Sequence, residues 1–246
     1  MAYADPYEIR TMAERNAGNP YVGRGIAVGF TKNMKKAVLA YFIMGRSANS
    51  RNRIFLKTGD DVMIKPFDAS KVEDPSLIIY YPVRTKGKQI IVTNGDQTDT
   101  VADEIDRNGV KDAFDHALLT RKFEPDPPNF TPRISAMLDL SDASHPGYEI
   151  SILKSGDPYG KTDAKFFFHY DGNESLGHFI HTYITDGNPI PTFTGEPERV
   201  SIPEDIDAFT NEIWDSIDAE NKVSLYVRYT DVKTGKYESR LINKNK

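Results

Sequence analysis

The chain has 246 residues, of which 39% are hydrophobic and 27% charged, and this composition is typical of a folded globular protein that forms one domain over 1–246. Its formal net charge of −5 and its sequence pI of about 5.6 disfavour a nucleic-acid partner, because a phosphate backbone attracts basic surfaces. The absence of cysteine excludes disulfides, thiolate metal sites and a cysteine nucleophile, and the lack of a basic leader or long apolar run predicts a cytoplasmic protein with no membrane partner.

The first ninety residues are rich in predicted strands. After a polar N-terminal extension at 1–18, apolar runs at 24–31 and 37–45 flank a lysine-rich segment, which predicts an antiparallel hairpin. Residues rich in Ile, Val and Tyr predict three further strands, at 54–58, 76–84 and 89–93. Gly87 between the last two runs indicates a turn, so a second hairpin is expected.

The middle of the chain combines helical and extended patterns. Apolar residues at helical spacing predict a helix over 101–119, with Gly109 as the candidate division between two helices. A proline-rich loop at 124–128 leads into a strand that begins near Arg133. Three later strands are expected, at 148–153, 164–170 and 178–184.

The C-terminal part holds one predicted helix and one hairpin. The helix is expected to begin at Ser201, ahead of Pro203, and its apolar face is formed by Ile206, Phe209, Ile213 and Ile217. Runs at 223–230 and 236–242 predict a closing hairpin, and the lysine-rich tail 243–246 is expected to fray. Because the strand–helix alternation of a parallel sheet is missing, the pattern favours an α+β fold with mostly antiparallel sheets.

Two early segments are candidates for an anion site. Residues 19–25 resemble a glycine-rich phosphate loop, but they precede a strand, so a dinucleotide fingerprint is rejected and a turn entering the strand is the alternative. The segment 45–53 carries Arg46, Arg51 and Arg53 directly after an apolar strand. Arginine grips phosphate with a planar fork of donors, so this is the stronger candidate, with a solvated loop as the alternative.

Two later segments add polar groups. Residues 93–100 follow a strand and open a helix, where ligands often bind, although an Asn-Gly turn and a helix cap explain part of this density. Glu124 and the unit 131–133 bracket the proline-rich loop. Arg133 heads an apolar strand, where its charge requires a ligand or a structural ion pair.

No metal site is assigned from the sequence. His178 and His181 are three residues apart in a predicted strand and therefore face opposite sides, which makes them a poor metal pair. His116 and His169 are isolated. The acidic residues within 96–106 are explained by a helix N-terminus, which favours negative charge.

Four blocks in this order resemble the archaeal-type IMP cyclohydrolases and their bacterial relatives. The blocks are 21–24, 46–51, 94–103 and 131–134. Between them, 74–80 with Arg84, and 123–126, are also similar to the family. The resemblance covers roughly the first 140 residues, and the C-terminal third carries extra length without a visible match.

The resemblance implies a four-layer αββα sandwich similar to the N-terminal-nucleophile hydrolases, without their self-processed nucleophile. The implied reaction is the dehydrative closure of 5-formamido-1-(5-phosphoribosyl)imidazole-4-carboxamide to IMP, in purine biosynthesis, with no cofactor. Both reacting groups belong to one molecule, so the work consists of positioning, proton transfer and stabilisation of an oxyanion. A homo-oligomer is also plausible by analogy with the family.

By match to the family, the chemistry is assigned to Arg51, Tyr80 and Glu124. Glu124 would handle the proton of the attacking amide, while Tyr80 and Arg51 would donate towards the formyl oxygen. Tyr81 is the alternative to Tyr80, since neighbouring strand residues face opposite sides. The residues expected to bind the substrate are the phosphate candidates Arg24, Arg46 and Arg133, and the ribose or base candidates Tyr21, Ser47, Asn94 and Asp96.

Three alternatives stay open at this point. A purine-nucleotide-binding protein of the same fold without the activity predicts tight IMP binding and no turnover. An amide hydrolase of the N-terminal-nucleophile type requires internal cleavage that exposes a Ser or Thr. A structural or interaction domain predicts no binding of purine nucleotides and leaves the clustered arginines unexplained.

Overall fold

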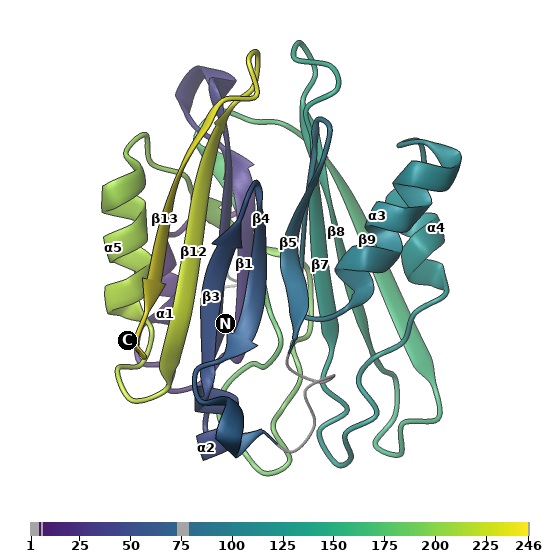
Figure 1. Ribbon diagram of the computed structural model, residues 1–246, viewed down its shortest axis with the longest axis vertical. Helices are drawn as coiled ribbons and strands as arrows, with labels where there is room; N and C mark the ends of the chain where they lie inside the picture. The colour runs from purple at the N-terminus through teal and green to yellow at the C-terminus, as the bar shows by residue number, and fades with distance from the viewer. Residues whose placement is uncertain (1–4, 6, 73–78, 246) are drawn as a thin grey trace.

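Two antiparallel sheets face each other in the computed structural model, which describes residues 5, 7–72 and 79–245 (Figure 1). The first sheet has six strands in the order β11-β10-β1-β2-β12-β13. Their bounds are β1 Arg24–Phe30, β2 Lys36–Met44, β10 Leu176–His181, β11 Glu198–Ser201, β12 Lys222–Asp231 and β13 Tyr237–Asn243. This sheet therefore joins the N-terminal hairpin to the C-terminal one.

The second sheet is a meander of seven strands in chain order. Its strands are β3 Arg53–Thr58, β4 Asp61–Pro66, β5 Tyr80–Lys86, β6 Gln89–Thr93, β7 Arg133–Asp139, β8 Gly147–Ser155 and β9 Asp163–Asp171. Each strand pairs antiparallel with its sequence neighbour, and two helices intervene between β6 and β7.

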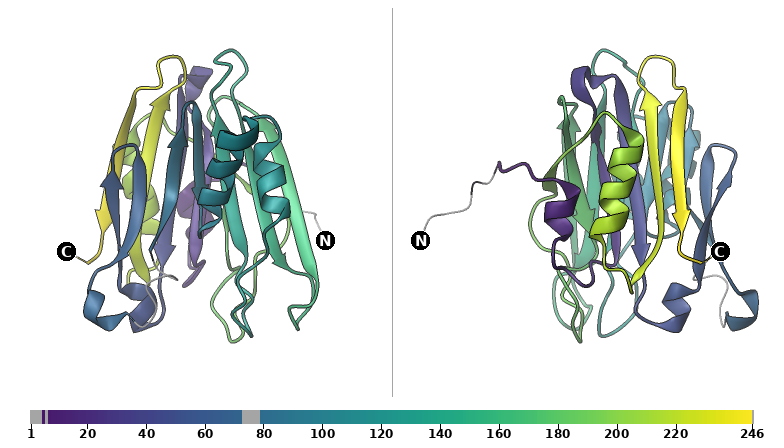
Figure 2. Two further views of the ribbon diagram at one scale, coloured as in Figure 1. Left: turned by 45° about the vertical axis from the view of Figure 1, so that its right-hand side comes forward. Right: turned by 90° about the vertical axis from the view of Figure 1, so that its left-hand side faces the viewer.

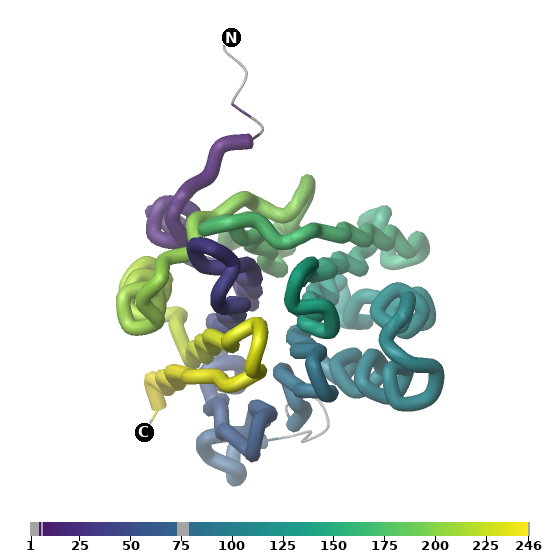
Figure 3. The backbone as a smooth tube through the Cα atoms, turned by 90° about the horizontal axis from the view of Figure 1, so that it is seen from above, coloured from purple at the N-terminus to yellow at the C-terminus, as the bar shows by residue number. Residues whose placement is uncertain are grey.

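Helices cover the outer face of each sheet, which gives four layers (Figures 1 and 2). On the six-stranded sheet, α1 (Met12–Asn16) packs beside α5 (Ile206–Ser216). On the seven-stranded sheet, α3 (Gln97–Asn108) packs beside α4 (Ala113–Leu119). The view along the strands shows the same helix–sheet–sheet–helix order (Figure 3). The expected αββα sandwich is therefore confirmed.

The core lies mainly between the sheets, and strand alternation decides which side chains enter it. Ile26, Tyr41 and Tyr226 lie opposite one another on β1, β2 and β12, and all three are fully buried in the layer between the sheets. Their neighbours Ala27 and Ala40 face the outer layer of helices. Because both faces of these strands are covered, their sequences are nearly continuous apolar runs.

Most of the expected elements are present, and the main difference is the start of the last helix. The helical pattern at 101–119 is divided as expected, and Gly109 ends α3 with φ +84°. Ser201 does not begin a helix but closes β11, and α5 begins at Ile206. The reason is local: the Asp205 side chain accepts a hydrogen bond from the Ala208 amide, so the helix is capped at Asp205 and begins after it.

The remaining differences concern short segments. The pattern did not predict α1, β4, β11, the one-turn helix α2 (Ala48–Arg51) or the 3-10 turns Lys32–Met34 and Ala69–Lys71. Residues 73–78, where the strand expected at 76–84 begins, lie outside the described residues, and β5 starts at Tyr80.

The two termini differ from simple polar ends. The segment expected to fray makes defined contacts as far as Asn245. The Asn243 side chain bonds the backbone N–H and C=O of Phe55, and the Asn245 side chain donates to the Arg51 carbonyl. Met12 of the expected extension is fully buried against the outer core. Within the described residues, no helix is long and apolar enough to cross a membrane.

Candidate active site

A cleft of about 1110 Å³ opens at the end of the sandwich where α2 lies, at the bottom of Figure 1. Both sheets contribute to it, because β1, β3, β5 and β7 all begin at this end and β2 and β6 finish there. Nine of the ten predicted site residues line it: Tyr21, Arg24, Arg46, Ser47, Tyr80, Asn94, Asp96, Glu124 and Arg133. The fold thus brings together segments that are more than 100 residues apart.

Two arginines and one carboxylate form the centre of the cleft. Arg24 begins β1 and Arg53 begins β3, and the buried Nε of each lacks a hydrogen-bond partner. Burial alone lowers the pKa of Arg24, but the charges of Glu124 and nearby tyrosines outweigh it and raise the pKa. Burial and the charge of Arg24 lower the pKa of Arg53. Glu124 is therefore the acidic counterpart of two closely spaced cations.

A pair of tyrosine hydroxyls lies beside these charges. The Tyr80 hydroxyl donates to the carbonyl oxygen of Asn94 at 3.0 Å and lies 3.4 Å from the Tyr41 hydroxyl. Burial, with the neighbouring Tyr80, raises the pKa of Tyr41 well above its usual value, so Tyr41 keeps its proton. Tyr81 instead stacks against the Arg84 guanidinium, 4.3 Å from its ring centre. Tyr80, and not Tyr81, lines the cleft.

Arg133 is held in place by the start of α3. Its guanidinium donates to Gln97 Oε1 at 2.6 Å and pairs with Asp96 at 3.0 Å, and Asp96 also binds Arg121. A Cβ on Gly95 would lie 2.1 Å from Arg133 Nη1, so only glycine lets the guanidinium lie against this turn. Burial opposes but does not cancel the two arginines, which lower the pKa of Asp96.

Asn94 has a mainly structural place in the cleft wall. Its side-chain oxygen accepts from the Ile134 amide at 2.9 Å, and its nitrogen donates to the Pro132 carbonyl at 2.8 Å. Gln97 donates to the same oxygen. Since Asn94 is 1% exposed and its amide is engaged, it ties the end of β6 to the beginning of β7.

Arg46 and the tyrosines form the opposite wall. Arg46 binds the Asp186 carboxylate and the Gly187 carbonyl, and its guanidinium lies 5.3 Å from the Tyr21 ring centre. Tyr21 stacks on Tyr183 with ring centres 5.8 Å apart. An aromatic surface beside a guanidinium suits a flat heterocycle with an attached anion.

Arg51 is the predicted residue that the structure places outside the cleft lining. Its Nε donates to the Gly45 carbonyl at 2.9 Å and its Nη2 donates to Asn221 at 2.8 Å. Arg51 is the last residue of α2, whose first turn is capped by Ser47. The Arg51 guanidinium therefore holds the loop after β2 in place. Arg53, two residues later, lines the cleft in its stead.

A further group of two hydroxyls and a carboxylate joins Tyr183, on the loop after β10, to the loop that precedes β7, and the sequence pattern did not assign this group to the site. The Tyr183 hydroxyl lies 2.6 Å from Thr131 Oγ1, which donates to Asp126 at 2.5 Å. The proximity of Asp126 to Glu124 in the chain was a usable signal for its place. Nothing in the pattern indicated Tyr183 or Asp186, because their segment joins the cleft only through the fold.

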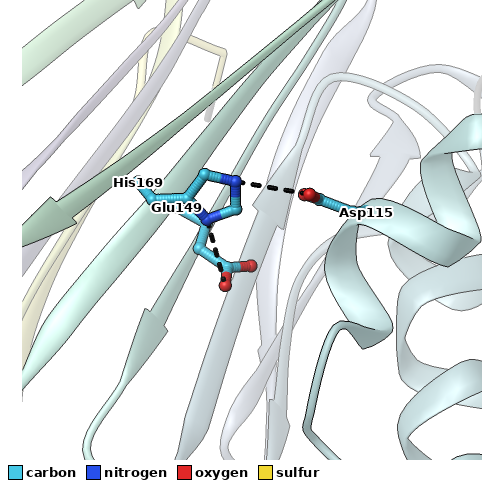
Figure 4. A group of neighbouring side chains, drawn as sticks. All are labelled: Asp115, Glu149 and His169. Atoms are coloured by element: carbon cyan, nitrogen blue, oxygen red, sulfur yellow. Dashed lines mark ion pairs between the residues drawn. The ribbon is translucent and has the colours of Figure 1, made fainter.

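The histidines lie away from the cleft lining. On the outer face of the seven-stranded sheet, His169 Nε2 lies 3.3 Å from Asp115 and its Nδ1 lies 3.6 Å from Glu149 (Figure 4). Ligand atoms of these three residues lie within 4.8 Å of one another, so they could hold a metal ion. The two carboxylates address different ring nitrogens, however, and an imidazole presents only one nitrogen to a given ion. This arrangement suits an ion pair better.

His178 and His181 face opposite sides of β10, as expected. His178 Nδ1 lies 2.6 Å from the Tyr148 hydroxyl in the layer between the sheets. Burial lowers the pKa of His178 to about 4, and the charge of Arg199 acts in the same direction. His181 Nδ1 lies 2.6 Å from the Tyr183 carbonyl on the other side.

A family model described as IMP cyclohydrolase-like protein matches residues 21–235. The IMP cyclohydrolase of Methanococcus aeolicus is 34% identical over 124 residues, which are 50% of this chain and 60% of that protein. The one of Methanocella arvoryzae is 33% identical over 144 residues, 56% of this chain and 69% of that protein. The one of Methanocaldococcus jannaschii is 35% identical over 124 residues, 50% and 58% of the two chains. The matched part thus spans between 58% and 69% of the length of these relatives.

Proposed function

The chain belongs to the IMP cyclohydrolase-like family, and from this premise we propose that its cleft closes the purine ring of IMP. The substrate is 5-formamido-1-(5-phosphoribosyl)imidazole-4-carboxamide. Its carboxamide nitrogen attacks the formyl carbon, and the formyl oxygen leaves as water. One proton comes from the carboxamide nitrogen and one from the formamido nitrogen, so the reaction needs no oxidant, reductant or cofactor.

The observation that carries this proposal is the charge arrangement at the centre of the cleft. The negative charge of Glu124 favours the charged form of both Arg24 and Arg53, and the Tyr80 hydroxyl interacts with the same two arginines. A carboxylate can accept the proton of the attacking amide, while cationic and phenolic donors stabilise the oxyanion that forms on the formyl oxygen. These are the two kinds of group that an intramolecular dehydration requires.

The role first assigned to Arg51 passes to Arg53 in this proposal. Arg51 is engaged with Gly45 and Asn221, whereas Arg53 lines the cleft with an unpartnered Nε. We therefore assign the chemistry to Glu124, Tyr80 and Arg53. Glu124 moves protons, and Tyr80 and Arg53 donate towards the formyl oxygen.

The walls of the cleft suit the rest of the nucleotide. Arg133 and Arg46 line the cleft, and with Arg24 they are the phosphate candidates of this proposal. Tyr21 and Tyr183 offer an aromatic surface to the base, while Ser47 and Asp96 offer polar groups to the ribose. Because Asp186 occupies Arg46, substrate phosphate would have to replace that carboxylate.

The proposal is tested by following the ultraviolet absorbance change as purified protein is mixed with the formamido substrate. We expect turnover far above the rate in buffer, and the same turnover in the presence of a metal chelator. No rate above buffer would contradict the proposed activity. IMP affinity would then be measured, because tight binding without turnover supports a nucleotide-binding protein of this fold.

A further inference from the structure

A second cleft lies at the opposite end of the sandwich from the candidate active site, between the β5–β6 and β12–β13 turns at the top of Figure 1. Its volume is about 280 Å³. Both sheets line it, with apolar contributions from Ile90, Leu140 and Val232. The rest of the lining is Thr85, Gly87, Lys88, Arg228, Thr230, Lys233, Thr234 and Gly235. This lining contains three cations and no carboxylate.

Arg228 is the unusual member of this lining. It is 3% exposed. Because alternate residues of a strand face the same side, Arg228 lies on the same face of β12 as the core residue Tyr226, which points into the layer between the sheets. A full positive charge therefore lies in the layer between the sheets. The neighbouring inward-facing residues of β12, Tyr226 and Thr230, are uncharged. A buried charge is normally paired with an opposite one.

Within the described residues, the groups that contact the Arg228 guanidinium are all uncharged. Its Nε donates to Thr230 at 3.0 Å, and its Nη1 donates to Thr85 Oγ1 at 2.8 Å and to the Asp60 carbonyl at 3.2 Å. The Tyr237 ring centre lies 3.8 Å from the guanidinium carbon. No carboxylate of the described chain lies within ion-pair distance of Arg228.

The nearby carboxylates are engaged elsewhere. Asp60 accepts the Tyr237 hydroxyl at 2.9 Å. Asp231 accepts the Lys233 and Thr234 amides and the Thr234 hydroxyl, and so shapes the β12–β13 turn. The turn in turn presents Lys233 at the mouth of the cleft, opposite Lys88 from the β5–β6 turn. Within the described residues, Arg228, Lys88 and Lys233 therefore form no ion pair with a carboxylate.

We propose that this second cleft binds the phosphate group of a small molecule or free inorganic phosphate. Arg228 supplies a guanidinium charge at the buried side of the cleft, and the exposed Lys88, which also donates to the Ser141 carbonyl at 3.3 Å, and Lys233 supply two ammonium groups. The Thr230 hydroxyl, whose oxygen accepts from Arg228 Nε, can donate its proton to a further phosphate oxygen. This site is separate from the candidate active site and does not depend on the proposed cyclisation.

The site is tested by titrating isotope-labelled protein with inorganic phosphate at constant ionic strength and recording amide shifts by NMR. We expect saturable shifts at Gly87 and Gly235, which line the second cleft, and none when chloride replaces phosphate. Gly95 reports phosphate that enters the candidate active site, so the two sites give separate binding curves. Absence of a saturable shift at Gly87 and Gly235 would overturn the proposal.

Variants separate a built site from general surface charge. Replacing both rim lysines, Lys88→Gln with Lys233→Gln, should weaken the Gly235 binding curve about tenfold, because charge-assisted hydrogen bonds are lost. The matched control Lys236→Gln removes a charge from the same hairpin, outside the cleft lining, and should leave the curve unchanged. Arg228→Met should abolish it. Equal affinity in the double variant and the control would also overturn the proposal.

A parallel titration with ribose 5-phosphate identifies the source of the phosphate group. Tighter binding of ribose 5-phosphate supports a phosphate monoester as the ligand, and tighter binding of inorganic phosphate supports the free ion. Failure of both to shift Gly87 and Gly235 contradicts the site altogether.

Discussion

Arg51 and Arg53 are two residues apart, yet they serve different parts of the molecule. Both belong to an arginine-rich segment that the sequence marks as an anion site, and the residue types alone do not rank them. Their difference arises from α2, a single turn of four residues that has no hydrophobic period to reveal it. Arg51 ends that turn and bonds the loop, whereas Arg53 begins β3 beside Arg24.

The first prediction compares these two arginines. Arg53→Met should lower kcat/KM at least about 100-fold, because removing one donor to an oxyanion has an effect of that size. Arg51→Met should stay within about threefold of the wild-type value, since it loses only loop contacts. Steady-state kinetics of both variants decides the matter. An Arg53→Met variant with the kcat/KM of the wild type would contradict the catalytic role of Arg53 and favour Arg51.

The second prediction concerns Arg133, whose charge is fixed by Gln97 and Asp96 at the cleft rim. Arg133→Ala should weaken IMP binding about tenfold or more and change kcat much less, because a phosphate contact is made equally in substrate and transition state. Arg107→Ala, which loses only an exposed pair with Asp103, is the control for charge. Equal dissociation constants for IMP in the two variants would contradict the assignment of Arg133 to the phosphate site.

The third prediction concerns acid stability and His178. Its pKa is lowered to about 4 by burial, below the value near 6.5 of an exposed histidine. The unfolded chain therefore binds a proton that the folded chain refuses, and stability is full above pH 6.5 and falls as the pH drops towards 4. Between pH 7 and pH 5 this amounts to about 2 kcal/mol.

Urea unfolding at these two pH values checks this sign. His178→Gln should remove that part of the pH dependence, whereas His116→Gln, at an exposed position, should keep it. A His178→Gln protein with the same acid sensitivity as the wild type would show that another group is responsible.

At the scale of elements, the cleft depends on how strand ends are tied together. Asn94 bonds the backbone of Pro132 and Ile134, and Gln97 continues this network to Arg133. The Asn-Gly pair at 94–95 was readable as a turn, and the polar density around it as a site. The hydrogen bonds that tie the Asn94 amide to the backbone of Pro132 and Ile134 depend on β7 and were not visible in the sequence.

The fourth prediction follows from this tie. Asn94→Ala should lower the free energy of unfolding by about 2 kcal/mol or more, because the Ile134 amide and Pro132 carbonyl lose a buried partner. Asn108→Ala, which loses one exposed bond to Glu104, should change it by less than about 0.5 kcal/mol. Chemical denaturation of the two variants provides the comparison, and similar values for both would contradict the structural role of Asn94.

At the scale of the whole molecule, the layers were more predictable than the site. Continuous apolar strands and few helices indicate sheets buried on both faces, and the family resemblance supplied the αββα order. The cleft, in contrast, combines the ends of β1, β3 and β7 with the loop that follows β10. Tyr183 enters it, and Asp186 reaches Arg46, only because β10 pairs with β1 across the six-stranded sheet, a long-range pairing that no local pattern encodes.

The two ends of the sandwich carry different kinds of side chain. One end collects Glu124 with several arginines and tyrosines, and the other collects Arg228 with two lysines and no carboxylate. Both clefts lie where strands of the two sheets finish and the core between them opens. Acid–base chemistry is therefore expected only at the first end, where a carboxylate faces the cations.

The most direct test of the account is the turnover of Glu124→Gln beside that of Glu174→Gln, which removes an exposed carboxylate outside the cleft lining. With the formamido substrate in excess, we expect kcat of the Glu124 variant to fall about 100-fold or more while IMP still binds, since general acid–base catalysis contributes about this factor. The Glu174 variant should match the wild type. A folded Glu124→Gln protein that cyclises at the wild-type rate would contradict the central claim.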